Sequence, residues 1–135
     1  MEYMEIALSL AKKAFKSSEI PVGAVIVRNE KIISKGLNNR HSKNNVLGHA
    51  EIIALTKAQK KLKTWHLSDC EMYVTLKPCD LCEKVIKASR IKKVYYLLEK
   101  QVNKKEFSKT IIEKLNAYPT EEYKKMLTDF FIDKR

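Results

Sequence analysis

The chain has 135 residues, of which 44% are hydrophobic, and its formal net charge is +11 from 27 basic and 16 acidic residues. This size fits a single domain over residues 1–135 with one hydrophobic core and leaves little room for a second domain. No apolar run approaches the length of a membrane span, and residues 1–5 are acidic where a signal peptide is basic. We therefore expect a cytoplasmic protein without a membrane partner.

The positive charge is compatible with a polyanionic partner such as nucleic acid. Nearly all of the excess is lysine spread along the chain, and genome composition alone can produce the same richness in lysine. Charge by itself therefore leaves nucleic-acid binding open.

Two helices that flank a hairpin are expected in the first half of the chain, in the order helix 3–16, strand 22–27, strand 31–37 and helix 49–62. Asn29 and Glu30 supply the tight turn of the hairpin. Residues 38–48 are polar and rich in turn-forming residues, so we expect a loop that ends directly at His49.

In the second half the expected elements are strand 72–76, a helix from Pro78 to about residue 89, strand 94–98 and helix 121–132. Pro78 fits the first helical position, where its missing N–H costs nothing. Residues 107–116 predict either a helix or a short strand around 110–112, and Thr120 is a good N-cap for the last helix. Strands that alternate with helices predict an α/β domain with helices on both faces of a mixed sheet.

The chain contains a histidine, two cysteines and an acid at informative spacings, in His49-Ala50-Glu51 and in Pro78-Cys79-Asp80-Leu81-Cys82. Zn²⁺ prefers thiolate and imidazole ligands, and a catalytic zinc site uses three protein ligands and keeps a fourth position for water. His49, Cys79 and Cys82 supply three ligands. The two cysteines are three residues apart, so they share one face at the start of a helix.

Glu51 is the candidate proton shuttle of such a site, since it would accept a proton from the zinc-bound water and return it to the substrate. Residues two apart on a helix do not share a face. His49 and Glu51 can therefore converge only in the first turn, and the loop that ends at Gly48 places them there.

Each part of this pattern has a simpler interpretation when it is taken alone. Cys79 and Cys82 could form a redox pair or half of a structural zinc site, but a structural site needs a fourth ligand. His41 and His66 have no convincing spacing for that role. The third cysteine, Cys70, precedes an apolar run and is expected to be an inert buried thiol, and an odd count argues against a disulfide framework.

At these residues the chain resembles the cytidine-deaminase-like superfamily, and more closely the bacterial tRNA adenosine deaminases. The His49-Ala50-Glu51-Ile52 segment and Pro78-Cys79…Cys82 match the metal and proton-shuttle motifs. The other matching segments are Glu19–Val27, Gly36-Leu37-Asn38, Tyr73–Leu76, Ser89-Arg90-Ile91 and Met126–Phe131.

The resemblance implies a three-layer α/β/α domain with a central mixed sheet of four to five strands, one Zn²⁺ per subunit and a homodimer. It implies hydrolytic deamination of adenosine to inosine in tRNA, at the wobble position of the anticodon. By the same resemblance Asn38 hydrogen-bonds the target base and Val22 packs against it. Phe131, with Phe130, contacts neighbouring nucleotides, although core packing explains these two residues equally well. The helix after Pro78 forms the dimer contact through Leu81, Val85 and Ile86, unless these simply pack on the sheet.

The chain departs from the family pattern in three places. Lys77 stands where the family usually has Glu, and Glu83-Lys84-Val85 stands where it has small residues. The glycine-rich segment after the fourth strand is replaced by residues 99–105, and the region is shorter. Lys77 reverses a charge one residue from the motif, which would alter the pocket rim or the dimer contacts. The changed segment after the fourth strand bears on tRNA docking and on a fifth strand. The metal site is untouched.

Two other functions compete with the tRNA deaminase. A small-molecule deaminase of guanine, cytosine or a nucleotide would use the same site but would not need the charge excess or the Phe130-Phe131 helix. A non-catalytic RNA-binding or partner subunit would keep zinc for structure only. Such a scaffold has no use for the acid at Glu51.

Overall fold

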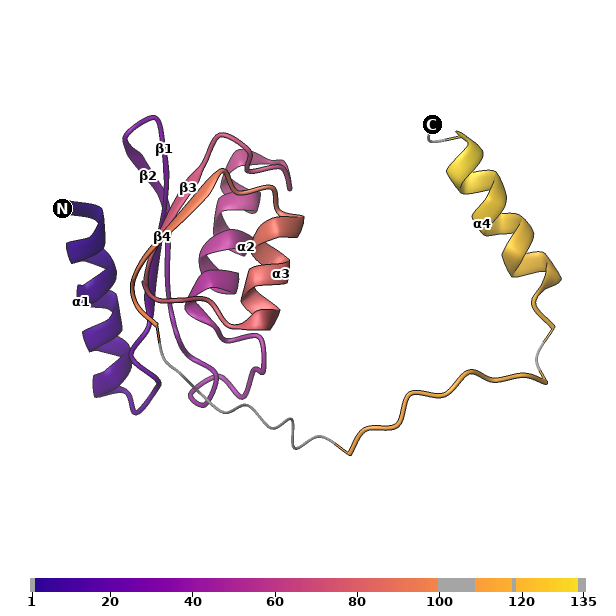
Figure 1. Cartoon of the computed structure of the whole chain (residues 1–135), viewed down its shortest axis with the longest axis horizontal. Helices are drawn as coiled ribbons and strands as arrows, with labels where there is room; N and C mark the ends of the chain where they lie inside the picture. The colour runs from indigo at the N-terminus through magenta and orange to yellow at the C-terminus, as the bar shows by residue number, and fades with distance from the viewer. Residues whose placement is uncertain (1, 100–108, 118, 134–135) are drawn as a thin grey trace. The chain divides into compact units, whose positions relative to one another are not determined.

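The computed structural model describes residues 2–99, 109–117 and 119–133 (Figure 1). Its contacts divide the chain into two compact units, Met1–Val102 and Asn103–Arg135, and each is described by itself. A single deaminase domain over residues 1–135 stays a prediction. Within the described ranges, no helix is both long enough and apolar enough to cross a membrane.

The first unit is built on a four-stranded mixed sheet with the order β2-β1-β3-β4. The strands are β1 (Gly23–Arg28), β2 (Lys31–Leu37), β3 (Glu71–Leu76) and β4 (Lys93–Leu98). β1 pairs antiparallel with β2 and with β3, whereas β3 and β4 are parallel. Asn29 and Glu30 both have positive φ, 50° and 63°, as a two-residue hairpin turn requires. The predicted hairpin and mixed sheet are confirmed.

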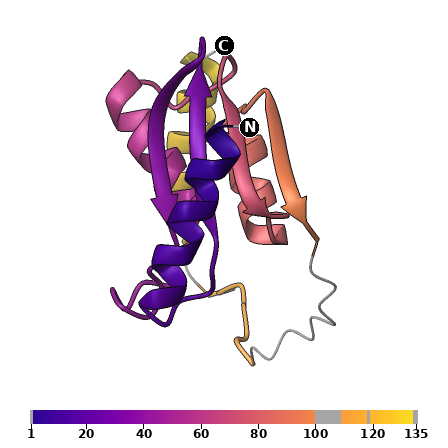
Figure 2. The same cartoon turned by 90° about the vertical axis from the view of Figure 1, so that its left-hand side faces the viewer.

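Helices cover both faces of this sheet, as Figures 1 and 2 show. α1 (Glu2–Lys16) packs on one face, while α2 (Ala50–Leu62) and α3 (Asp80–Ala88) pack on the other. Side chains of a strand alternate between faces. Val25 and Val27 therefore join the α1 cluster, and Ala24 and Ile26 join the larger core under α2 and α3. The three-layer α/β/α prediction is confirmed.

The helix start predicted at Pro78 is wrong by two residues. Cys79 has extended backbone angles, φ −68° and ψ 170°, and is the N-cap, so α3 begins at Asp80. A proline favours an extended or turn conformation as readily as a first helical turn. The shift matters because it places a candidate ligand at the cap itself.

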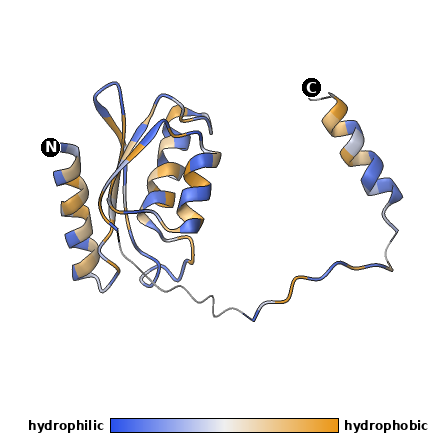
Figure 3. Ribbon diagram, in the orientation of Figure 1, coloured by the Kyte–Doolittle hydropathy of each residue, from blue (hydrophilic) through white to orange (hydrophobic). Residues whose placement is uncertain are grey.

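The second unit contains α4 (Glu121–Asp133), and Figure 3 shows that α4 is hydrophilic at its start and more hydrophobic toward its end. The helix or strand predicted over 107–116 is absent from its described part, residues 109–116. Ile111 and Ile112 are 86% and 95% exposed. A short segment owes most of its helicity to the burial of an apolar face, which these residues lack. The described residues also contain no fifth strand.

Gly36 sets the distance between β2 and the start of α2. A Cβ atom at this position would overlap the Ala50 carbonyl oxygen and lie 2.8 Å from the Ala54 nitrogen. Nearby, the Ser34 hydroxyl donates a 2.7 Å hydrogen bond to the Ala54 carbonyl. Strand and helix therefore meet backbone to backbone, and this contact fixes the end of α2 that carries the candidate catalytic residues.

We predict that Gly36→Ala lowers the free energy of unfolding by about 1–3 kcal/mol, because the added methyl group forces strand and helix apart. The neighbouring exposed substitution Lys35→Ala should stay within about 0.5 kcal/mol of the parent. Urea unfolding followed by circular dichroism measures both. Equal midpoints for Gly36→Ala and the parent chain would contradict the tight packing.

Candidate metal centre and active site

Three candidate ligands come together at the starts of two helices. His49 is the N-cap of α2, Cys79 is the N-cap of α3, and Cys82 lies in the first turn of α3. One ligand atom from each residue lies within 4.8 Å of the other two. Because α2 and α3 lie side by side on one face of the sheet, their first turns meet (Figure 1).

The cluster fits a zinc ion by donor chemistry and by distance. Zinc binds thiolate sulfur at about 2.3 Å and imidazole nitrogen at about 2.0–2.1 Å, so two ligand atoms on one tetrahedral ion lie roughly 3.5–4 Å apart. The observed spread needs only small side-chain adjustments to meet this geometry. Two thiols and one imidazole are also a set found at catalytic zinc sites, which keep a fourth position open.

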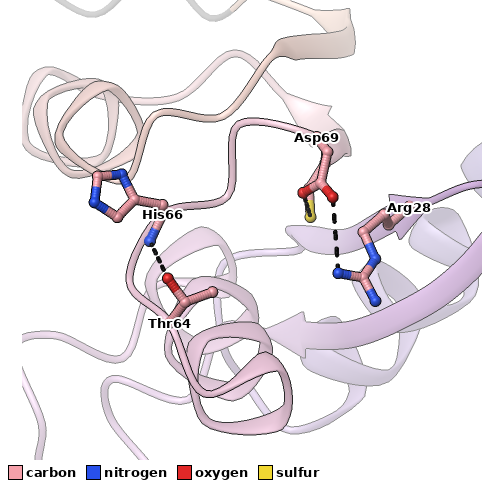
Figure 4. A network of polar contacts seen from close by, with 5 residues as sticks. Arg28, Thr64, His66 and Asp69 are labelled. Atoms are coloured by element: carbon pink, nitrogen blue, oxygen red, sulfur yellow. Dashed lines mark hydrogen bonds and ion pairs between the residues drawn. The ribbon is translucent and has the colours of Figure 1, made fainter.

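A fourth protein ligand is absent from this cluster within the part of the chain that the structure describes. The exposed His66 ring stacks on Trp65 with ring centroids 3.6 Å apart. Figure 4 shows this ring turned away from Asp69 and Arg28, while the His66 backbone N–H donates to the Thr64 hydroxyl. His41 is exposed in the loop. The cluster therefore favours a catalytic site over a structural one.

Glu51 lies in the first turn of α2, two residues after His49, where the two side chains were expected to converge. It is only 4% exposed, and the Cys82 thiol is close enough to influence its pKa. Burial raises the pKa of Glu51, and bonds from its own backbone N–H and from Cys82 partly oppose this shift. A buried carboxyl group is thus held directly beside the metal cluster.

The pKa of the Cys82 thiol bears on how the site binds a cation. Burial, followed by the charges of Glu51 and Cys79, raises the pKa of Cys82. Only the thiolate binds metal, so a divalent ion between these ligands would reverse the shift in pKa and release a proton.

The third cysteine, Cys70, lies outside the cluster. Burial and the neighbouring Asp69 raise the pKa of Cys70 to about 11. Cys70 is fully buried in the core, as its prediction as an inert thiol requires.

Asn38 is placed next to the start of α2. Its side-chain Oδ1 accepts a 2.7 Å hydrogen bond from the Ala50 backbone N–H, and its own backbone N–H donates to the Val22 carbonyl at 3.3 Å. The side-chain NH₂ group is the polar group that this arrangement leaves for hydrogen bonding to a base. Asn38 is therefore hydrogen-bonded to Ala50, the residue between His49 and Glu51.

Val22 and Phe131, the two other residues predicted to contact the substrate, lie in different units of the chain. The Val22 side chain is 5% exposed and belongs to the core cluster under α2 and α3. Phe131 belongs to the second unit, is 61% exposed and packs edge-to-face on Phe130 with ring centroids 5.5 Å apart. Contact of either residue with a substrate stays a prediction.

Two further features frame the site. Glu19, which in the sequence is only part of a segment that resembles the family, has its carboxylate buried against the loop before His49. An acid before an apolar run gives no sign of burial in a single sequence.

Lys77, the residue before Pro78 that departs from the family pattern, forms a 2.9 Å ion pair with Glu99. This bond and the Glu99 charge raise the pKa of Lys77.

Comparison with known proteins points to one group. Residues 1–98 match the family model of the cytidine and deoxycytidylate deaminase zinc-binding region. A tRNA-specific adenosine deaminase of Rickettsia bellii is 50% identical over 95 residues, which are 69% of this chain and 66% of the relative. The enzyme of the same name from Aquifex aeolicus is 37% identical over 138 residues, 96% of this chain and 91% of the relative. The chain thus spans slightly less than two thirds of the Rickettsia relative and nearly all of the Aquifex one.

Solved structures give two informative neighbours. A structure from studies of A-to-I editing by tRNA:A34 deaminases is 36% identical, with a TM-score of 0.70 over 73% of this chain and 76% of that one. Guanine deaminase from Bacillus subtilis is 28% identical, with a TM-score of 0.78 over 95% of this chain and 92% of that one. Both neighbours share the fold, and the identity is higher for the tRNA:A34 deaminase.

We predict that Cys82→Ser reduces bound zinc at least about tenfold, because the site loses a thiolate ligand. The matched change Cys70→Ala also removes a buried thiol but lies outside the cluster, so it should keep the zinc content of the parent chain. Elemental analysis of gel-filtered protein measures zinc, and circular dichroism checks the fold. Full zinc retention in folded Cys82→Ser would refute the assignment.

Proposed function

Because this chain belongs to the family of the cytidine and deoxycytidylate deaminase zinc-binding region, we propose that it is a zinc-dependent tRNA adenosine deaminase. It converts adenosine to inosine by hydrolysis, at the wobble position of an anticodon loop. The observation that carries the proposal is the buried carboxyl group of Glu51 beside His49, Cys79 and Cys82.

Sequence similarity and charge support tRNA as the substrate. The tRNA-specific relatives are 37–50% identical, compared with 28% for the guanine deaminase. A net charge of +11 suits binding to phosphates, and it predicts binding that weakens as salt increases. The bases of an anticodon loop are unpaired, so one can be turned into a pocket at modest cost.

Hydrolysis replaces the amino group at C6 of adenine with oxygen and releases one ammonia for each water consumed. When bound, zinc supplies the nucleophile because it lowers the pKa of a water molecule toward neutral pH. Glu51 takes up a proton that the reacting water loses and delivers it to the ring nitrogen. It then carries the second proton to the departing ammonia, so that both protons of the water are accounted for.

The remaining residues bind and orient. His49, Cys79 and Cys82 hold one zinc ion per subunit, and the Asn38 amide hydrogen-bonds the target base. Val22 lines the floor under that base through its position beside Asn38. Phe131 contacts nucleotides that flank the target.

We also propose that the enzyme is a cytoplasmic homodimer that uses α3 as its contact. Of the three apolar residues considered for this contact, Val85 and Ile86 pack against the core of the same chain. Leu81 is 44% exposed and remains available. A dimer contact through α3 would therefore centre on the first turn of that helix, close to the metal ligands.

A deaminase of free guanine is the second candidate, because the B. subtilis guanine deaminase matches 95% of this chain. The two functions differ in substrate size. We predict that the zinc-loaded chain forms inosine in an anticodon stem-loop with adenosine at the wobble position and leaves free adenosine, cytidine and guanine unchanged. Mass spectrometry of the digested RNA measures the product. Turnover of guanine alone would overturn the tRNA assignment.

For the catalytic role of Glu51, we predict that Glu51→Gln lowers the turnover rate by about 10²–10⁴-fold with unchanged zinc content, since the amide cannot carry protons. Single-turnover assays with the stem-loop and elemental analysis measure the two quantities. Glu30→Gln, at the exposed turn between β1 and β2, is the control and should keep the parent rate. An unaffected rate in Glu51→Gln would favour a non-catalytic zinc protein.

A further inference from the structure

The loop of residues 38–48 links β2 to α2 and lies between two functional positions. It begins at Asn38 and ends just before His49. Its closure depends on backbone bonds, from the Asn39 N–H to the Gly48 carbonyl at 3.0 Å and from the Gly48 N–H to the Asn45 carbonyl at 2.8 Å. A Cβ atom at Gly48 would lie 2.6 Å from the Arg40 nitrogen, so the closed end of the loop is tightly packed. A displacement of the loop would therefore also move the residues at its two ends, Asn38 and Gly48.

The Glu19 carboxylate anchors the middle of this loop from a different segment of the chain. Its Oε1 accepts the His41 N–H at 3.1 Å, and its Oε2 accepts the Ser42 N–H at 2.7 Å. The residue is only 5% exposed, although it is an acid. Hydrogen bonds to a charged acceptor are stronger than those between neutral groups. A buried carboxylate that satisfies two backbone donors is thus a firm attachment point.

The charge state of Glu19 agrees with this attachment. Burial alone would raise the pKa of Glu19, but the backbone N–H bonds from His41 and Ser42 act in the opposite direction. The Ser42 hydroxyl and the nearby His41 charge add to that effect, and the net result is a pKa below the ordinary value of a glutamate. The carboxylate is therefore charged at neutral pH.

The same short segment holds the loop at a second point. Three residues after Glu19, the Val22 carbonyl accepts the Asn38 N–H. Asn38 in turn accepts the Ala50 N–H, and Ala50 lies between His49 and Glu51. A continuous series of contacts thus runs from Glu19 through the loop and Asn38 to the first turn of α2.

We propose that Glu19 is a positioning residue of the active site, which holds the loop so that Asn38 stays bonded to Ala50 and faces the substrate base. This inference rests on the proposed function, because it concerns presentation of a base to the deaminase site. The hydrogen bonds of the Glu19 carboxylate go to the loop, so Glu19 would act through the loop. A displacement of about 1 Å in such a contact can cost roughly 10²-fold in rate.

Amide hydrogen exchange on the zinc-loaded full chain tests the anchor without any substrate. In Glu19→Gln one acceptor oxygen becomes an NH₂ group that cannot accept a hydrogen bond. We expect exchange at His41, Ser42 and Ala50 to become at least about tenfold faster, with zinc content unchanged. Glu30→Gln removes the same charge at an exposed turn and should leave all three amides as they are. Unchanged exchange at Ala50 in Glu19→Gln would overturn the proposal.

Kinetics separate positioning from general stability. We expect Glu19→Ala to lower kcat/KM on the stem-loop by about 10–100-fold at full zinc occupancy. If Glu19 acts through Asn38, the double variant with Asn38→Ala should be no slower than Asn38→Ala alone, within about threefold. Multiplying effects, or losses that follow zinc content, would assign Glu19 a purely structural role.

The failures of the two proposals are distinguishable. If the parent chain forms no inosine, the proposed function fails, and the exchange rate at Ala50 still decides whether Glu19 fixes Asn38. If the parent is active and the Glu19 variants match it, only the positioning role fails. Should Glu19→Ala not fold, Glu19→Gln carries the same kinetic comparison, because it keeps the shape of the side chain.

Discussion

Everything in the site depends on two helices that begin beside each other. An N-cap side chain normally accepts a hydrogen bond from the first free N–H groups of its helix. His49 and Cys79 are both N-caps, yet neither side chain makes this bond. Their ligand atoms belong to the metal cluster instead. Asn38 supplies part of what α2 then lacks, because its side chain accepts the Ala50 N–H from outside the helix. The loop and α2 are therefore coupled, because a loop side chain satisfies a backbone N–H at the start of the helix.

Electrostatics explain why two helix starts are used. A zinc ion, two thiolates and the Glu51 carboxylate sum to one negative charge in a buried place. Each helix start carries roughly half a positive charge, so two of them offset that excess. The raised pKa values of Glu51 and Cys82 show how unfavourable these groups are as anions without a cation. Metal binding and the charge state of the site are thus one equilibrium, and it should tighten as pH rises and the thiols lose protons.

Most of the first unit could be predicted from the sequence because its signals are local. Alternating and helical spacing identified the strands and helices, and the motif around His49 and Cys79 predicted which residues cluster. The helix start predicted at Pro78 was wrong because proline is favourable both before a helix and at its first position. Glu19 was missed as an anchor because its partners are backbone N–H groups more than 20 residues away, and backbone donors leave no mark on a sequence. The helix or strand predicted over 107–116 is absent from its described part, residues 109–116, because an apolar spacing stabilises an element only where the apolar side chains are buried.

The choice of substrate must reside outside the metal cluster. One fold serves a guanine deaminase and a tRNA:A34 deaminase, so the shared architecture cannot by itself select between a free base and a base in RNA. In this chain two features adjoin the metal cluster directly in sequence. The loop that Glu19 anchors reaches Asn38, and Lys77 stands next to Pro78 with its charge paired to Glu99. Because that pairing neutralises the lysine locally, the changed residue before the cysteine motif adds little net field at the metal ligands. The loop also meets α2 directly, because Asn38 accepts the Ala50 N–H between His49 and Glu51, so a change in the loop would reach the start of that helix.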